Sequence, residues 1–137
     1  MEADFLILAD AAEVAGDKVY MLGGAWSAIH CHQGMPVVHP LALVAGILVG
    51  WMETNRSHTF RVEVRNEDTN DVIYFAEGQF ETGRPPGIPA GMTQRFPIAL
   101  KVAPKFDVAG QYVARLIVND EELKRAPFLV IDHTARR

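Results

Sequence analysis

Hydrophobic and polar residues alternate along several short stretches of the chain, as they do in strands with one buried face. The clearest stretch is Ser57 to Arg65, where every second residue from Phe60 onward is apolar and the residues between are charged. This alternation predicts a strand that is packed on one side and wet on the other. Val72 to Phe80 follows after a polar tip at 66–71, so the two segments predict a hairpin.

A second hairpin is predicted nearer the C-terminus, from Gly110 to Val118 and back from Leu123 to Ile131. Pro127 has no N–H to donate, so the returning strand is expected at a sheet edge or to be bulged there. Between the hairpins, the stretch 83–91 holds three prolines and three glycines, which predicts an extended crossing loop. The loop leads into a strand from Met92 to Val102.

The N-terminal part gives weaker signals. Leu41 to Met52 is a run of twelve residues without a charge, which predicts a strand buried on both faces or bent at Gly46. Asp4 to Val14 is compatible with a strand or a short helix. We favour a strand that turns at 15–17 and returns from Val19 to Trp26.

Together these segments predict an all-β fold, an antiparallel β-sandwich of eight or nine strands that is immunoglobulin-like or jelly-roll-like. Turn signals every eight to fifteen residues, without helical periods between them, carry this prediction. The length of 137 residues fits one domain, residues 1–137.

Composition narrows the function classes. The 13 lysines and arginines are scattered and the net charge is −4, so no basic stripe is present to bind nucleic acid. The start of the chain is acidic, without a secretory signal, and the longest apolar run is too short to cross a bilayer. Cys31 is the single cysteine. We therefore expect a cytoplasmic protein that does not bind membranes and needs no cofactor.

The order of several turn and packing motifs resembles a family of uncharacterised small bacterial β-sandwich proteins. The matching motifs, in chain order, are Leu8-Ala9-Asp10, Ala12-Glu13-Val14, Gly23-Gly24-Ala25-Trp26, Pro85-Pro86-Gly87 with Gly91, Gly110-Gln111-Tyr112 and Pro127-Phe128. The resemblance covers most of the chain and implies a small sandwich. It implies no activity, ligand or site residue. The Gly-x-Tyr strand is also typical of immunoglobulin-like sandwiches in general.

No catalytic constellation stands out. The two serines, Ser27 and Ser57, do not lie in a nucleophile elbow. Ser57 and His58 are adjacent, as are Cys31 and its flanking histidines, and adjacent residues on a strand point to opposite faces. We therefore expect a protein that is not an enzyme.

Two kinds of metal site are conceivable. His30 and His32 are expected on one side of a strand, and with His39 they form a candidate zinc site. The acidic tips at 66–71 and 119–122 are a candidate calcium site if they share one end of the sandwich. Solvated histidines and ordinary polar turns are the competing interpretations.

The favoured hypothesis is a binding or assembly module that forms a homo-oligomer or binds a protein partner. Leu41–Met52 and Tyr112–Val118 carry few charges, so each is a candidate edge strand for pairing with another chain. The crossing loop is a candidate partner-binding ridge, with the residues Arg84, Pro85, Pro86, Ile88 and Met92.

Overall fold

The computed structural model describes residues 1–135, which form eleven strands and one turn of 3-10 helix. The elements in chain order are β1 (Glu2–Ala15), β2 (Lys18–Gly24), β3 (Ala28–Cys31), β4 (Val37–Val38), β5 (Leu41–Val49), η1 (Trp51–Glu53), β6 (His58–Asn66), β7 (Val72–Phe80), β8 (Gln94–Val102), β9 (Lys105–Phe106), β10 (Gly110–Val118) and β11 (Glu121–Asp132). The protein is therefore all-β, as predicted. The hairpins β6–β7 and β10–β11 are confirmed, and 83–91 is a loop.

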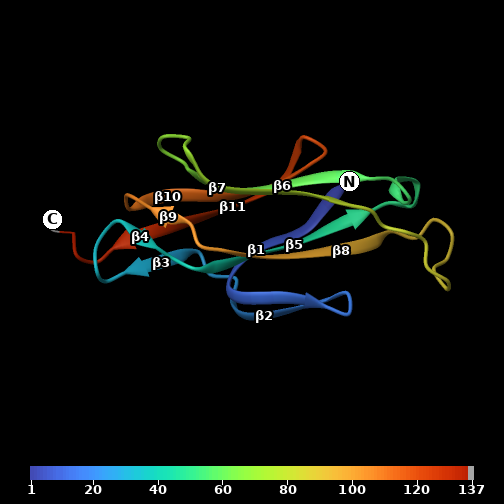
Figure 1. Cartoon of the computed structure of the whole chain (residues 1–137), viewed down its shortest axis with the longest axis horizontal. Helices are drawn as coiled ribbons and strands as arrows, with labels where there is room; N and C mark the ends of the chain where they lie inside the picture. The colour runs from blue at the N-terminus through green and yellow to red at the C-terminus, as the bar shows by residue number, and fades with distance from the viewer. Residues whose placement is uncertain (136–137) are drawn as a thin grey trace.

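The strands form two main sheets (Figure 1). Four strands pair in the order β2-β1-β5-β8, and five pair in the order β3-β11-β10-β6-β7. The short strands β4 and β9 make a separate ribbon. All pairs are antiparallel except β3 with β11, which run parallel, so the five-stranded sheet is mixed.

One hydrophobic core is shared by residues of both main sheets. Leu43 and Ile47 of β5 and Val62, Val64 and Leu116 of the other sheet are among its fully buried members. At one end three aromatic rings pack together, with Tyr112 edge-on to Phe106 and stacked on Phe128. Burial of these large side chains is the main favourable contribution to folding.

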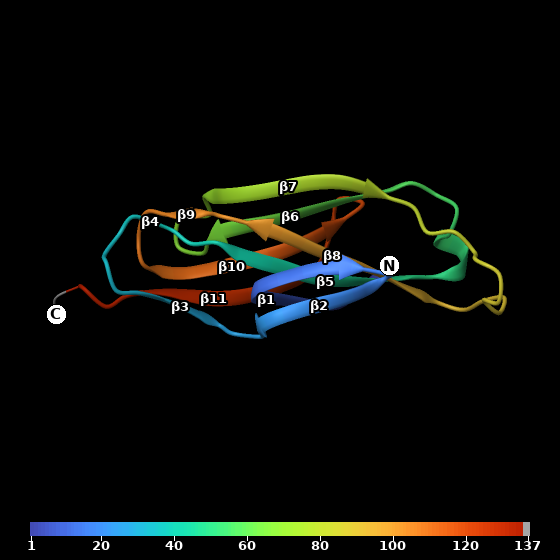
Figure 2. The same ribbon diagram turned by 60° about the horizontal axis from the view of Figure 1, so that its bottom comes forward.

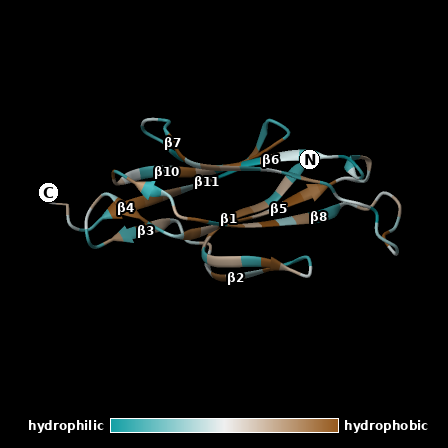
Figure 3. Ribbon diagram, in the orientation of Figure 1, coloured by the Kyte–Doolittle hydropathy of each residue, from teal (hydrophilic) through white to brown (hydrophobic). Residues whose placement is uncertain are grey.

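The strand β5 is buried on both faces, as predicted, and its pairing with β8 continues without a register shift through Gly46. Leu41, Leu43 and Ala45 belong to the main core, whereas the alternating residues Ala42 and Val44 belong to a second cluster. Hydrophobic colours dominate β5 in Figure 3. Gly46 is needed for packing, because a β-carbon there would lie 2.6 Å from the Phe5 ring.

The second cluster exists because the distal part of the β1–β2 hairpin covers the outer face of the four-stranded sheet. We call residues 10–24 the hairpin arm. Ala12 and Val19 of the arm pack with Val44 of β5 and Ala99 of β8. The arm lies below β5 in Figure 1 and comes in front of it in the turned view of Figure 2. The segment 4–14 is thus a strand and not a helix.

Two of the sequence-based predictions about edges were wrong. Leu41–Met52 and Tyr112–Val118 contribute β5 and β10, which both lie in sheet interiors. These segments carry few charges because β5 is buried on both faces and β10 lies between two neighbouring strands, and neither has a free edge. Pro127 also lies in an interior strand, but β3 pairs with β11 only from Leu129 onward, so the missing N–H faces no partner strand.

Candidate functional site

The hairpin arm exposes a cluster of apolar side chains. Tyr20, Met21 and Leu22 follow one another on β2 and are 55%, 39% and 74% exposed; Tyr20 and Leu22 share one face of the strand, and Met21 points to the other. Val14, 40% exposed, lies opposite Val19 on β1. An apolar-lined groove of about 380 Å³ runs beside them, with Glu13 of β1 and Lys101 of β8 at its rim. Tyr20 and Leu22 thus form an exposed apolar pair on one face of β2, and exposed apolar patches of this kind mark interaction surfaces.

The strand β2 is also the edge of its sheet, because only β1 pairs with it among the described strands. Natural edge strands are protected by charges, prolines or bulges against pairing with other chains. Between Lys18 and Gly24, β2 carries one charge, at Lys18, and no proline. Its free edge is therefore unprotected over Val19 to Leu22.

The outer face of the five-stranded sheet carries charged side chains, in contrast to the apolar hairpin arm. Glu63 on β6 is almost completely buried, and Arg61, Arg65 and Arg115 all donate to its carboxylate. Burial alone would raise the pKa of Glu63, but the hydrogen bond from Arg61 and the charges of Arg115 and Arg65 outweigh it and lower the pKa. The network ties β6 to its neighbour β10.

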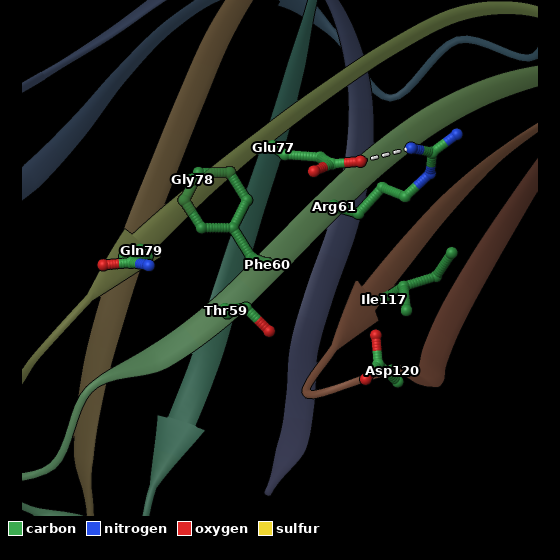
Figure 4. A pocket seen from close by; sticks show the side chains of 8 residues that line it. All are labelled: Thr59, Phe60, Arg61, Glu77, Gly78, Gln79, Ile117 and Asp120. Atoms are coloured by element: carbon green, nitrogen blue, oxygen red, sulfur yellow. Dashed lines mark hydrogen bonds and ion pairs between the residues drawn. The ribbon is translucent and has the colours of Figure 1, made fainter.

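A shallow groove of about 400 Å³ lies on the same face (Figure 4). Thr59, Arg61, Glu77 and Gln79 line it from β6 and β7, and Asp120 lies at its other side. The Arg61 guanidinium is already bound to Glu77 at 2.5 Å and to Glu63 at 3.0 Å, and it stacks over the Phe75 ring. The Arg61 guanidinium in this groove is thus already paired with carboxylates, which makes the groove a weak site for an anionic ligand.

Three histidines gather at the other edge of this sheet. His30 Nδ1 and His133 Nε2 are 2.8 Å apart, and the His32 ring stacks on His133 at 4.6 Å between centroids. The parallel pairing of β3 with β11 brings these residues together. His39 is not part of this cluster. It follows β4, and its backbone N–H donates to the Pro104 carbonyl.

Sequence reasoning placed His30 and His32 on one side correctly and missed His133, which is more than a hundred residues away. Within residues 1–135, no three His, Cys, Asp or Glu side chains are arranged to hold a metal ion. The three-histidine zinc site with His39 therefore stays a sequence-based prediction.

The calcium prediction fails on topology. The turn after Val118 lies beside Phe60, at the start of β6, whereas the tip at 66–71 follows the end of the same strand. The two acidic tips are thus about 20 Å apart along β6. The Asn66 side chain is used within its own turn, where it accepts from the N–H groups of Asp68 and Thr69.

The crossing loop keeps most of its predicted ridge exposed. Pro85, Pro86 and Met92 are exposed, while Ile88 is half-buried. Arg84 is committed to the fold, because its guanidinium stacks over Trp51 at 3.8 Å and donates to the Trp51 carbonyl. Figure 1 shows this loop beside η1 at one end of the molecule. Partner binding by the ridge stays a prediction.

The environments of Cys31 and His58, two side chains that can take part in catalysis in other proteins, serve the fold. Cys31 is buried, and burial followed by the charge of Asp132 raises the pKa of its thiol, the reverse of what a nucleophile needs. His58 is buried beside Ser57, with one ring nitrogen 2.7 Å from the Glu53 carbonyl oxygen and the other 3.0 Å from the Asn119 amide. It fastens η1 to the β10–β11 turn.

The fold and surfaces therefore define an all-β protein whose most accessible feature is an apolar hairpin at a sheet edge. Residues 4–131 match the model of a family of unknown function, DUF6941, and the chain belongs to this family. A comparison with curated proteins finds no match. In the described part of the chain, no helix has the length and apolar character needed to cross a membrane.

Proposed function

We propose that the protein is a non-catalytic assembly module that self-associates through the hairpin arm. The observation that carries the proposal is the run Tyr20-Met21-Leu22, which is exposed on an edge strand with a free backbone. Burial of apolar surface drives association, and a free strand edge supplies hydrogen bonds to a partner. Both contributions coincide on this one element.

The framework that presents the arm is best described as a single β-sandwich domain. The shared core of the two main sheets supports this description, although the mixed five-stranded sheet departs from a purely antiparallel sandwich. A buried, unpaired Cys31 fits a reducing compartment, so we place the protein in the cytoplasm.

The test is the mass of the native chain with one apolar contact replaced by a charge. Leu22→Lys would add a charge to the free edge strand, and charged side chains there, lysine above all, oppose pairing with another chain. Met52→Lys is the matched control, because Met52 is also 74% exposed but lies on η1, outside the arm. Native mass spectrometry should show a dimer or larger oligomer for the wild type and Met52→Lys, and a shift toward monomer for Leu22→Lys. A monomeric wild type contradicts the proposal.

A second candidate function is binding of a transition metal ion at the histidine cluster. The observation in its favour is the gathering of His30, His32 and His133 at one edge of the five-stranded sheet; a cation bound there would replace the present 2.8 Å hydrogen bond between His30 Nδ1 and His133 Nε2. Calorimetric titration with zinc and nickel salts tests it. His133→Ala should abolish binding and His39→Ala should leave it unchanged; equal loss in both variants, or no binding by the wild type, refutes it.

A further inference from the structure

The free backbone groups of β2 can be assigned from the turn that precedes it. Gly16 and Asp17 both have positive φ, 56° and 59°, and connect the paired residues Ala15 and Lys18. This is a two-residue type I′ hairpin, in which the residues flanking the turn form a hydrogen-bonded pair. Hydrogen-bonded and non-hydrogen-bonded pairs then alternate along an antiparallel ladder.

The alternation fixes which residues face outward. Lys18, Tyr20 and Leu22 direct their N–H and C=O groups toward β1. Val19 and Met21 direct theirs to the free side of the sheet. Any strand added to this edge must therefore exchange its hydrogen bonds with Val19 and Met21.

We propose that the added strand is β2 of a second copy of this chain, running antiparallel about a two-fold axis at Tyr20. This inference rests on the proposed assembly function and specifies its contact. A two-fold axis perpendicular to the sheet pairs Val19 of one copy with Met21 of the other. These are the two residues with outward groups, so the ladder closes without an unpaired donor. Tyr20 then faces Tyr20 of the second copy.

The register follows from the length of the regular strand. β2 pairs residue by residue with β1 from Lys18 to Leu22, and its regular course ends at Gly23, where φ is +61°. An axis at Tyr20 brings every residue of this regular segment into the new ladder. An axis at Met21 would place Gly23, with its left-handed backbone, opposite Val19 and shorten the ladder.

The outward-facing residues Val19 and Met21 are symmetric about Tyr20, which fits a second copy as the occupant, and the charges of β2 do not oppose it. Lys18 is the single charged residue of β2, and in the proposed register it lies opposite Leu22 of the second copy. The aliphatic stem of the lysine packs on the leucine while its ammonium group stays in water. No like charges face each other, and the two tyrosines meet at the centre of the interface, where aromatic residues contribute most.

A single cysteine tests the register. Opposed residues of a non-hydrogen-bonded pair have α-carbons about 4.5 Å apart, within the span of a disulfide. Tyr20→Cys should therefore form a covalent dimer under mild oxidation in dilute solution. Leu22→Cys is the matched control, because its opposite residue is Lys18. The native Cys31 is buried and does not compete.

The outcomes separate the register from the function. Rapid cross-linking of Tyr20→Cys with little cross-linking of Leu22→Cys supports the inference. If the wild type and Tyr20→Cys are both dimeric but Tyr20→Cys does not cross-link, or if Leu22→Cys cross-links equally well, the register is overturned and the assembly function stands. If the wild type is monomeric from low to high micromolar concentration, both the register and the assembly function are contradicted.

Discussion

The Asp10 carboxylate lies over the α-carbon of Gly23, in the space that a side chain at position 23 would occupy. A β-carbon there would approach Asp10 Cγ to 2.8 Å, and the backbone φ of Gly23 is +61°. The relationship occurs where the hairpin arm leaves the plane of its sheet. The close approach and the left-handed backbone together explain why glycine is required at this bend.

Replacement of this glycine should therefore loosen the arm. Gly23→Ala combines left-handed strain with the contact to Asp10 and should cost about 1–3 kcal/mol of unfolding free energy. Gly16→Ala is the control, because Gly16 has a similar φ of +56° and no atom within 4 Å of a built β-carbon. Denaturant unfolding of both variants measures the difference. An equal cost would show that the Asp10 contact is unimportant.

The buried carboxylate of Glu63 should be indispensable to the outer face of the five-stranded sheet. Glu63→Gln leaves three guanidinium groups without their shared counter-charge and should destabilise the protein by about 3 kcal/mol. Glu77→Gln removes an exposed partner of Arg61 and should cost less than about 1 kcal/mol. Chemical denaturation checks both values. Similar small costs would mean that the network contributes little.

The same carboxylate predicts the direction of the acid response. The folded pKa of Glu63 is lowered, so the unfolded chain binds the proton more readily, and protonation favours unfolding. The stabilisation is present above the ordinary glutamate value of about 4.3 and is lost as the pH falls through the lower folded value. Unfolding free energy measured at a series of acidic pH values should decline less steeply for Glu63→Gln. An unchanged slope would assign the acid response to other groups.

The hydrogen bond of the Tyr112 hydroxyl should stabilise the fold at the start of β10. Its hydroxyl donates to the Val108 carbonyl at 2.6 Å while the ring is buried. Tyr112→Phe leaves that carbonyl without its donor and should cost about 1–3 kcal/mol, whereas Tyr74→Phe, at a half-buried position, should cost less. Thermal unfolding measures both effects.

Ionisation of the same phenol supplies a separate readout. Burial raises the pKa of Tyr112 above its ordinary value, against the effect of its hydrogen bonds. Spectroscopic titration of the tyrosines should therefore show one phenol that ionises late and disappears in Tyr112→Phe. If all tyrosines of the wild type ionise together, the buried site is not as described.

The sequence was sufficient to predict individual strands and hairpins. It was insufficient to predict which distant segments pair with each other. Alternation in 57–65 identified β6 because one face of that strand is packed and the other is wet. A short strand such as β3 has no such signal, and its pairing with β11 joins segments about a hundred residues apart. The meeting of His30 with His133 depends on that pairing, so it was not predictable.

The interaction surface was missed for a related reason. Lack of charge was interpreted as the mark of a free edge, but β5 lacks charge because the arm covers its outer face. One of the actual edge strands, β2, is short and was predicted only as a strand. The arm that covers β5 contains a left-handed backbone at Gly23, and composition does not reveal this conformation.

Sedimentation velocity of the wild-type chain, from low to high micromolar concentration, tests the assembly function most directly. Edge pairing through β2 predicts a sedimentation coefficient that rises with concentration to that of a dimer, and Leu22→Lys should abolish the rise. A coefficient that stays at the monomer value over the whole range would contradict the account.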